Sequence, residues 1–277
     1  MVAVSRGNRE TLRRVDFLME CIGFPPDQDL SRLADLARER GERVPWRGPG
    51  GEHLRVSLGG GLGVRLDREE GRFVWSLTPD YRSAQRLRVA LDAVSLSADS
   101  PSDAFVAGWA NPLPREDPST PSPDSYPVRA LLSDARRLPR TLERGHVIAM
   151  ALAGFALDVS YIGPDSGARE PWVAGLPHGA AILPLDGAQQ PAACLEVSLR
   201  ILRVQSLTNP LTDRRVDLVE VETPGRSLPF FVSPWQLAAD RLTLPRPGLR
   251  IEGTFFMCGR IVGGLGGPSQ RLGGAFG

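Results

Sequence analysis

Apolar residues recur with helical spacing in the first forty residues of the chain. One set spans residues 12–22 and ends at Gly23, where a glycine favours the end of a helix. A second set begins after Asp27 or Asp29, either of which is a suitable N-cap, and ends at Gly41. These two sets predict a short helical hairpin.

Beyond Trp46 the apolar residues change to a period of two, which is typical of strands with one buried face. This alternation predicts three strands, over residues 53–58, 62–67 and 72–77. The three glycines at 59–61 favour a tight turn between the first two strands. We therefore expect an antiparallel meander.

The next two segments have less regular patterns. Residues 86–96 fit both a helix and a strand, and their place after the meander favours a strand. Ser100 precedes Pro101 and lies three residues before Asp103, which is the pattern of a helix start with a capping box. We therefore expect a short helix from this point to about Ala110.

Six prolines fall within residues 112–127, and such a stretch cannot form a central strand. Apolar segments at 126–132 and 146–162 follow, and they need partners in a sheet. We therefore interpret 112–127 as an exposed loop inserted in a first domain that spans residues 1–180. A passage rich in Gly, Pro and Ala, residues 163–192, is the expected boundary to a second domain.

The last part of the chain alternates almost throughout. Its first and last strands are long, and the pattern resembles an OB-type barrel over residues 190–262 at the level of fold. Residues 263–277 are rich in glycine and are expected to form a mobile tail. The expected fold class is α+β and β-rich, with a helical hairpin and antiparallel-sheet domain followed by a small OB-like β-barrel. The strands expected in the barrel are residues 195–204, 215–222, 228–233 and 249–262.

All 33 basic residues are arginine, and 32 acidic residues balance them to a formal net charge of +1. The absence of lysine excludes Schiff-base chemistry, pyridoxal phosphate anchoring and P-loop phosphate binding, because each needs an amine. A coding bias toward arginine explains this absence, and selection for a lysine-free surface is the alternative. The balanced charge gives no general attraction to nucleic acid or to an anionic membrane.

The three cysteines, Cys21, Cys194 and Cys258, are odd in number and far apart, which argues against a disulfide framework and suits a reducing compartment. The longest apolar run, residues 147–157, is too short for a membrane helix, which needs about 20 residues. The first residues contain no apolar core of signal-peptide length. These features predict a soluble, cytoplasmic protein.

Local signatures of catalysis and metal binding are absent from the sequence. His53, His146 and His178 are far apart, and neither Cys-x-x-Cys nor His-Glu-x-x-His occurs. The Gly-x-Ser-x-Gly motif is absent as well. We therefore expect no metal, no cofactor and no locally encoded catalytic residue. A hydrolase would need a site assembled across the fold.

An OB-like barrel suggests single-stranded nucleic acid as a ligand, because such barrels stack bases on exposed aromatic residues beside basic groups. However, strand alternation places several of the available aromatic residues in the core, and the available residues are Phe230, Phe231, Trp235, Phe255 and Phe256. Glu220 and Glu222 are expected to pair with arginines across a hairpin. A structural role therefore ranks above nucleic-acid binding. The candidate binding residues are Arg200, Arg203, Trp235, Arg250 and Arg260.

By elimination, the predicted function is a non-enzymatic binding or scaffolding role with another protein as the partner. The missing catalytic signatures, the balanced charge and the loops rich in Pro and Gly favour it. Two alternatives stay open. One is single-stranded nucleic-acid binding through the C-terminal barrel, and the other is a hydrolase with a site assembled across the fold.

Overall fold

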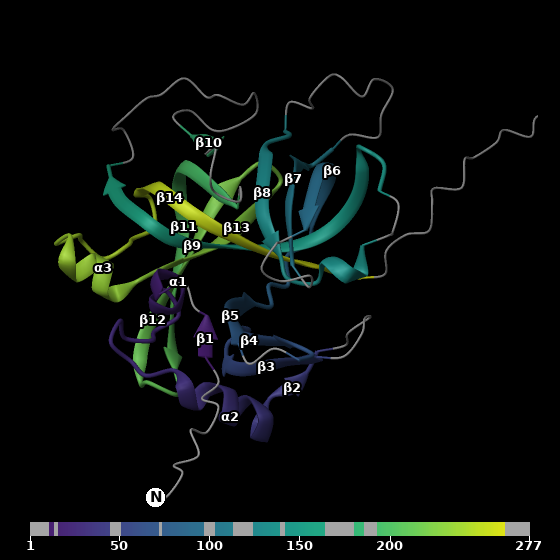
Figure 1. The fold of residues 1–277 in the computed structure, drawn as a ribbon. Helices are drawn as coiled ribbons and strands as arrows, with labels where there is room; N and C mark the ends of the chain where they lie inside the picture. Colours follow the sequence, from purple (N-terminus) through teal and green to yellow (C-terminus); the bar gives the residue numbers. More distant parts are fainter. Residues whose placement is uncertain are drawn as a thin grey trace, which may run out of the picture.

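The computed structural model is β-rich, with two sheets and few helices (Figure 1). Among the residues that it describes, no helix has the length and apolar character needed to cross a membrane. The described residues are 11–13, 16–44, 51–71, 74–96, 103–112, 124–138, 142–163, 180–185 and 193–263.

The smaller sheet contains the predicted meander. Its strands β2 to β5 are antiparallel, and β1 joins β5 in parallel at one edge. The turn between β3 and β4 is made by Gly59, Gly60 and Gly61, which all have positive φ (84°, 58° and 86°), so that glycine is favoured at each position. The strands are β1 (Thr11–Arg13), β2 (Glu42–Arg43), β3 (Gly51–Gly59), β4 (Leu62–Glu69) and β5 (Val74–Tyr81).

Two helices precede the meander, but they do not form the hairpin predicted over residues 12–22 and 27–41. Helix α1 covers only Asp16–Glu20, because residues 11–13 pair with β5 instead of continuing the helix toward the N-terminus. Helix α2 covers Ser31–Arg40 and buries Leu33, Ala34 and Ala37, as its periodicity predicts. Main-chain pairing with a distant strand overrides the local helical pattern of residues 11–13.

The larger sheet holds nine strands in the order β10-β11-β12-β13-β9-β14-β8-β7-β6. Strands β9 and β14 are long and run antiparallel along each other, from Arg250 beside Ile162 to Ile261 beside Met150. The strands are β6 (Leu87–Leu96), β7 (Ala104–Ala110), β8 (Pro127–Leu132), β9 (His146–Ile162), β10 (Ala181–Pro184), β11 (Cys194–Asn209), β12 (Arg214–Thr223), β13 (Arg226–Val232) and β14 (Arg250–Ile261).

Two additional pairings, β9 with β6 and β11 with β14, close the ladders of the larger sheet into two circuits. The first circuit runs β6-β7-β8-β14-β9 and returns to β6. The second circuit runs β11-β12-β13-β9-β14 and returns to β11. Both circuits share the β9–β14 ladder, which crosses the centre of the molecule (Figure 1).

The two circuits repeat the same plan. In each, three consecutive antiparallel strands are followed by a short helix and a long strand: the helix is η1 (Ala135–Arg137) in the first and α3 (Pro234–Ala239) in the second. We call β6 to β9 the first repeat and β11 to β14 the second repeat. The third strand of each repeat pairs in parallel with the long strand of the other repeat, β8 with β14 and β13 with β9. Each repeat therefore completes the circuit of the other.

The structure corrects one predicted element and adds another. Residues 104–110 form strand β7, not the helix predicted from the capping pattern at Ser100, because they pair along β6 on one side and β8 on the other. Helix α3 was not predicted, although Ser233 caps it and accepts a hydrogen bond from the backbone N–H of Gln236 at 3.3 Å. Residues 86–96 form a strand, as expected.

The shared ladder crosses the predicted domain boundary, since β9 lies before residues 163–192 and β14 lies after them. The four strands expected in the barrel are all present, as β11 to β14, and β9 joins them from outside residues 190–262. The described residues do not decide where domains 1–180 and 190–262 divide. Most of the loop at 112–127, most of 163–192 and the tail beyond 263 lie outside the described residues.

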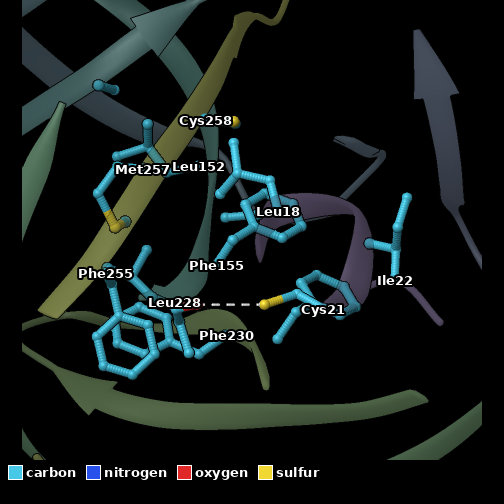
Figure 2. Close-up of a cluster of buried hydrophobic side chains, with 14 of the residues drawn as sticks. Leu18, Cys21, Ile22, Leu152, Phe155, Leu228, Phe230, Phe255, Met257 and Cys258 are labelled. Atoms are coloured by element: carbon cyan, nitrogen blue, oxygen red, sulfur yellow. Dashed lines mark hydrogen bonds between the residues drawn. The ribbon is translucent and has the colours of Figure 1, made fainter. Parts of the chain in front are cut away.

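Aromatic residues of both repeats fill the core beside the shared ladder. Phe155 stacks on Phe231 with ring centroids 5.3 Å apart, and Phe230 lies 4.4 Å from Phe255. All four side chains are fully buried. Figure 2 shows Leu18 of α1, and Cys21 and Ile22 just after the helix, beside this core. The helix therefore joins the N-terminal segment to the larger sheet by burying apolar surface.

Candidate functional site

The structure divides the five predicted binding residues among different environments. Arg200 makes a bidentate ion pair with Glu222, at 2.8 and 3.0 Å, and hydrogen bonds with this carboxylate raise the pKa of Arg200. Arg203 pairs with Glu220 at 3.1 Å. These are the cross-strand pairs expected between β11 and β12, and they neutralise the two arginines on an exposed sheet face.

The other three predicted residues do not join Arg200 and Arg203 in an exposed basic surface. Arg250 is buried, and its guanidinium donates to the carbonyl of Ser198 at 3.2 Å. Burial lowers the pKa of Arg250, and it does the same for the partly buried Arg260. Trp235 lies in α3, where it lines a groove described below.

The aromatic residues suggested for base stacking are also unevenly placed. Phe230 and Phe255 are fully buried in the core (Figure 2), as is Phe231, and Phe256 packs partly buried against it. A base cannot stack on a ring that has no exposed face. Among these aromatic side chains of the second circuit, Trp235 is the one that lines a groove open to a ligand.

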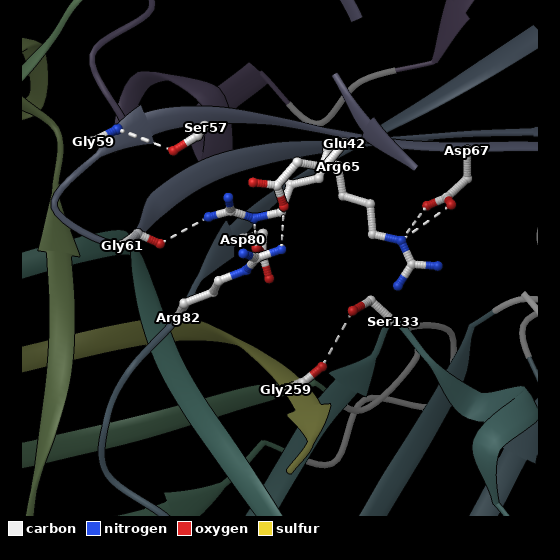
Figure 3. Close-up of polar contacts among 11 residues, drawn as sticks. Glu42, Ser57, Gly59, Gly61, Arg65, Asp67, Asp80, Arg82, Ser133 and Gly259 are labelled. Atoms are coloured by element: carbon white, nitrogen blue, oxygen red, sulfur yellow. Dashed lines mark hydrogen bonds and ion pairs between the residues drawn. The ribbon is translucent and has the colours of Figure 1, made fainter. Parts of the chain in front are cut away.

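His53 is buried in the smaller sheet, where its Nδ1 lies 2.6 Å from Oδ1 of Asp67. Arg65 donates to the same carboxylate, and Figure 3 shows its guanidinium pointing toward Ser133, in the turn after β8. The His53 side chain is only 3% exposed, so a substrate has no direct access to it. This geometry supports a structural role, in which His53, Asp67 and Arg65 form a buried polar cluster within the smaller sheet.

Cys21 and Cys258 are equally shielded, whereas Cys194 at the start of β11 is only partly buried. Burial raises the pKa of Cys21 to about 12 and that of Cys258 well above the ordinary thiol value, so neither forms a thiolate near neutral pH. His146 starts β9 and His178 lies outside the described residues. Within the described parts of the chain, no cluster of three or more His, Cys, Asp or Glu residues has an arrangement suited to a metal ion.

A groove of about 430 Å³ opens between α1, β9 and α3. Its walls combine apolar side chains with three carboxylates, and Phe17 at its rim is 61% exposed. This volume lies within the range of small-ligand and side-chain pockets, roughly 300–1,000 Å³. The lining residues are Phe17, Glu20, Pro26, Ala156, Leu157, Asp158, Ser233, Trp235, Gln236, Ala239 and Asp240.

A β-bulge in β9 shapes the floor of the groove. The register with β14 shifts between Thr254 and Phe255, so that Leu157 has no partner in the ladder. The carbonyl of Leu157 instead accepts a hydrogen bond from Nε2 of Gln236 in α3, at 3.2 Å. Bulges often redirect side chains at sites of function, and this one places Leu157 and Asp158 in the groove.

Gly253 of β14 is required where the chain passes this bulge. A Cβ atom at Gly253 would lie 2.1 Å from the carbonyl oxygen of Asp158, and φ at Gly253 is +143°. Both facts exclude a larger residue without movement of the backbone. The bulge and the glycine therefore form one local structure.

The lining of the groove is acidic. Glu20, Asp158 and Asp240 contribute carboxylates, and no lining residue is basic. The Ser233 hydroxyl donates to Oε2 of Glu20 at 3.3 Å, whereas Asp158 and Asp240 have no ion-pair partner among the described residues. An exposed apolar rim beside carboxylates suits a ligand that is both apolar and cationic.

The groove was not predicted, because its walls come from three separate segments of the sequence. The N-cap pattern Ser233-Pro234 would have indicated α3, and Trp235 was selected for a different reason. Comparison of the chain with known proteins finds no matching family, no matching curated protein and no matching solved structure. The geometry of the groove is therefore the feature from which a function can be inferred.

Proposed function

We propose that the protein is a non-enzymatic binding protein and that it binds a segment of another protein in the groove between α1, β9 and α3. The observation that carries this proposal is that the exposed Phe17 and the partly buried Trp235 both line a concave surface that several segments build. Aromatic side chains in a concave surface are typical of binding sites for proteins and peptides.

The environment of the titratable groups favours binding over catalysis. The buried Cys21, Cys258 and His53 are not accessible as a nucleophile or base. The arginines of β11 are neutralised by glutamates, which weakens the case for nucleic acid as the ligand. Binding of a protein segment requires neither an accessible catalytic group nor a basic surface.

We also propose that each circuit of the larger sheet is an OB-like barrel. Each circuit holds five strands with a helix before the last strand of its repeat, which supports a reading as an OB-like barrel completed by a strand of the other repeat. In this reading the shared β9–β14 ladder is the common wall of two barrels. Binding at the bulge of β9 would then use the wall that both barrels share.

Selection from a displayed library of random linear peptides tests the function. We expect enriched peptides that bind the wild-type protein and bind the Phe17→Ser variant about tenfold more weakly, because Phe17 loses apolar contact area in the complex. Affinity is measured by fluorescence anisotropy with the synthesised peptides. Thermal melting of both proteins establishes that the variant is folded.

The matched control is Leu96→Ser, since Leu96 is 67% exposed at the end of β6 and lies outside the groove. This variant should bind the peptides like the wild type. A selection that enriches no peptide argues against a peptide-binding function. Peptides that bind the wild type and the Phe17→Ser variant equally well would place the site elsewhere.

A further inference from the structure

The two circuits place corresponding residues at corresponding positions. In the parallel ladders, Leu131 of β8 pairs with Cys258, and Phe230 of β13 pairs with Gly154. Three residues beyond Leu131, Asp134 occupies the N-cap position of η1, and three residues beyond Phe230, Ser233 occupies the N-cap position of α3. The ladders thus define which residues of the two repeats correspond.

A hydrogen bond repeats at corresponding positions as well. Arg137 lies six residues beyond Leu131 and donates to the carbonyl of Ile261 at 2.7 Å. Gln236 lies six residues beyond Phe230 and donates to the carbonyl of Leu157 at 3.2 Å. Ile261 and Leu157 each lie three residues beyond the position that pairs in parallel. Arg137 and Gln236 therefore have the same structural role.

The charges at the two positions differ. In the first circuit, the guanidinium of Arg137 also contacts the carboxylate of Asp134 at 3.0 Å and the carbonyl of Gly263 at 2.6 Å. In the second circuit, neutral Gln236 faces a groove with three carboxylates and no basic residue. These carboxylates come from Glu20 of α1, Asp158 of β9 and Asp240 just after α3, and no cation lines the groove beside them.

We infer that the groove between α1, β9 and α3 binds an arginine side chain of the partner, flanked by apolar residues. This inference rests on the proposed protein-binding function and names its ligand. The guanidinium lies among Asp158, Asp240 and Glu20, and the apolar neighbours contact Phe17 and Trp235. A planar guanidinium suits carboxylates because it donates several hydrogen bonds in a fixed geometry.

The direct test compares two blocked peptides, acetyl-Leu-Arg-Leu-amide and the same peptide with citrulline in place of arginine. Citrulline has nearly the shape of arginine but no charge. We expect the arginine peptide to bind the wild-type protein and the citrulline peptide to bind at least about tenfold more weakly, by isothermal titration calorimetry. Equal affinity of the two peptides, or no binding of the arginine peptide, overturns the inference.

Substitutions in the groove extend the test. Asp240→Asn, at an exposed position, should lower the affinity for the arginine peptide several-fold and leave the affinity for the citrulline peptide unchanged. Gln236→Arg introduces the cation that the first circuit already has, and should abolish binding of the arginine peptide. Leu96→Arg is the matched control, because it adds the same charge at an exposed position outside the groove, and it should bind the arginine peptide like the wild type.

The library selection separates failure of this inference from failure of the proposed function. Enriched peptides that contain no arginine but bind less well to the Phe17→Ser variant would support the protein-binding function. They would also show that the groove does not require an arginine in its ligand. If Gln236→Arg lowers the melting temperature strongly, the Asp240→Asn comparison still decides the question. Equal loss of both peptides in Asp240→Asn counts against a contact specific to the guanidinium.

Discussion

The two circuits of the larger sheet share a ladder and a plan, but they differ where the helix meets the shared ladder. In the first circuit, Asp134 accepts the backbone N–H of Ile261 at 2.9 Å, and Arg137 donates to its carbonyl, so η1 is fastened directly to β14. In the second, a groove of about 430 Å³ opens between α3, α1 and β9. One repeated plan thus provides a closed junction and an open one.

The difference has a local cause in the shared ladder. The register of β9 with β14 shifts once, beside Leu157 and next to α3, and stays regular near Ile261 and η1. The bulge frees the carbonyl of Leu157 for Gln236 and directs Asp158 into the groove. A single extra residue in one strand therefore distinguishes two otherwise corresponding junctions.

Gly253→Ala has the largest expected effect and tests the bulge itself. The new Cβ would lie 2.1 Å from the carbonyl oxygen of Asp158, at a φ that residues with a side chain rarely adopt. We expect the free energy of unfolding to fall by about 3 kcal/mol, measured by urea denaturation. The control is Gly248→Ala, with φ +89° and open space around the new Cβ, which should cost about 1 kcal/mol. Equal costs would show that the close approach does not hold the bulge.

Asp134→Ala tests the closed junction. The backbone N–H of Ile261 and the guanidinium of Arg137 both lose an acceptor, and we expect a loss of about 2 kcal/mol in the free energy of unfolding. Asp134→Asn keeps one acceptor oxygen and should cost less. If both substitutions are neutral, the hydrogen bonds of Asp134 do not fasten η1 to β14.

The same carboxyl gives a pH dependence. Burial raises the pKa of Asp134, so the folded protein binds its proton more tightly than the unfolded chain. The contribution of Asp134 to the free energy of unfolding should therefore fall as the pH rises from about 3.9, the ordinary value, through the raised pKa. The slope is measured as the difference between the wild type and Asp134→Asn, which cannot titrate. An opposite sign of that difference contradicts the burial effect.

Arg137→Gln has the smallest expected effect and makes the first junction resemble the second. Glutamine can keep one carbonyl contact but loses the ion pair with Asp134. Because Arg137 is 38% exposed, solvent screens that ion pair, and we expect a loss of about 1 kcal/mol. Thermal melting at two salt concentrations measures it. A larger loss would mean that the cation itself holds the first junction closed.

Strand periodicity predicted most of the β-structure. The segments at 53–58, 62–67, 146–162 and the four after residue 190 all form strands near the expected bounds. The departures from the predicted helices at residues 11–13 and 104–110 have a common reason. In both places a local helical signal competes with main-chain pairing to strands distant in the sequence, and that pairing prevails.

The candidate site was less predictable than the strands. The cross-strand pairs of Arg200 with Glu222 and Arg203 with Glu220 follow from alternation on neighbouring strands, and they were expected. The groove depends on α1, β9 and α3, which meet only after the chain has folded. Neither the register shift at Leu157 nor the correspondence of Arg137 with Gln236 is visible in a one-dimensional pattern.

The sequence by itself determined the β-rich class, the positions of most strands and turns, the balanced charge without lysine and the absence of local catalytic motifs. These properties depend on neighbouring residues, where periodicity and turn preference act. Only the tertiary structure decided that the two repeats complete each other's circuits, that one junction is closed and the other open, and that three carboxylates gather beside Phe17. Those properties depend on pairing between distant strands, which local preferences do not specify.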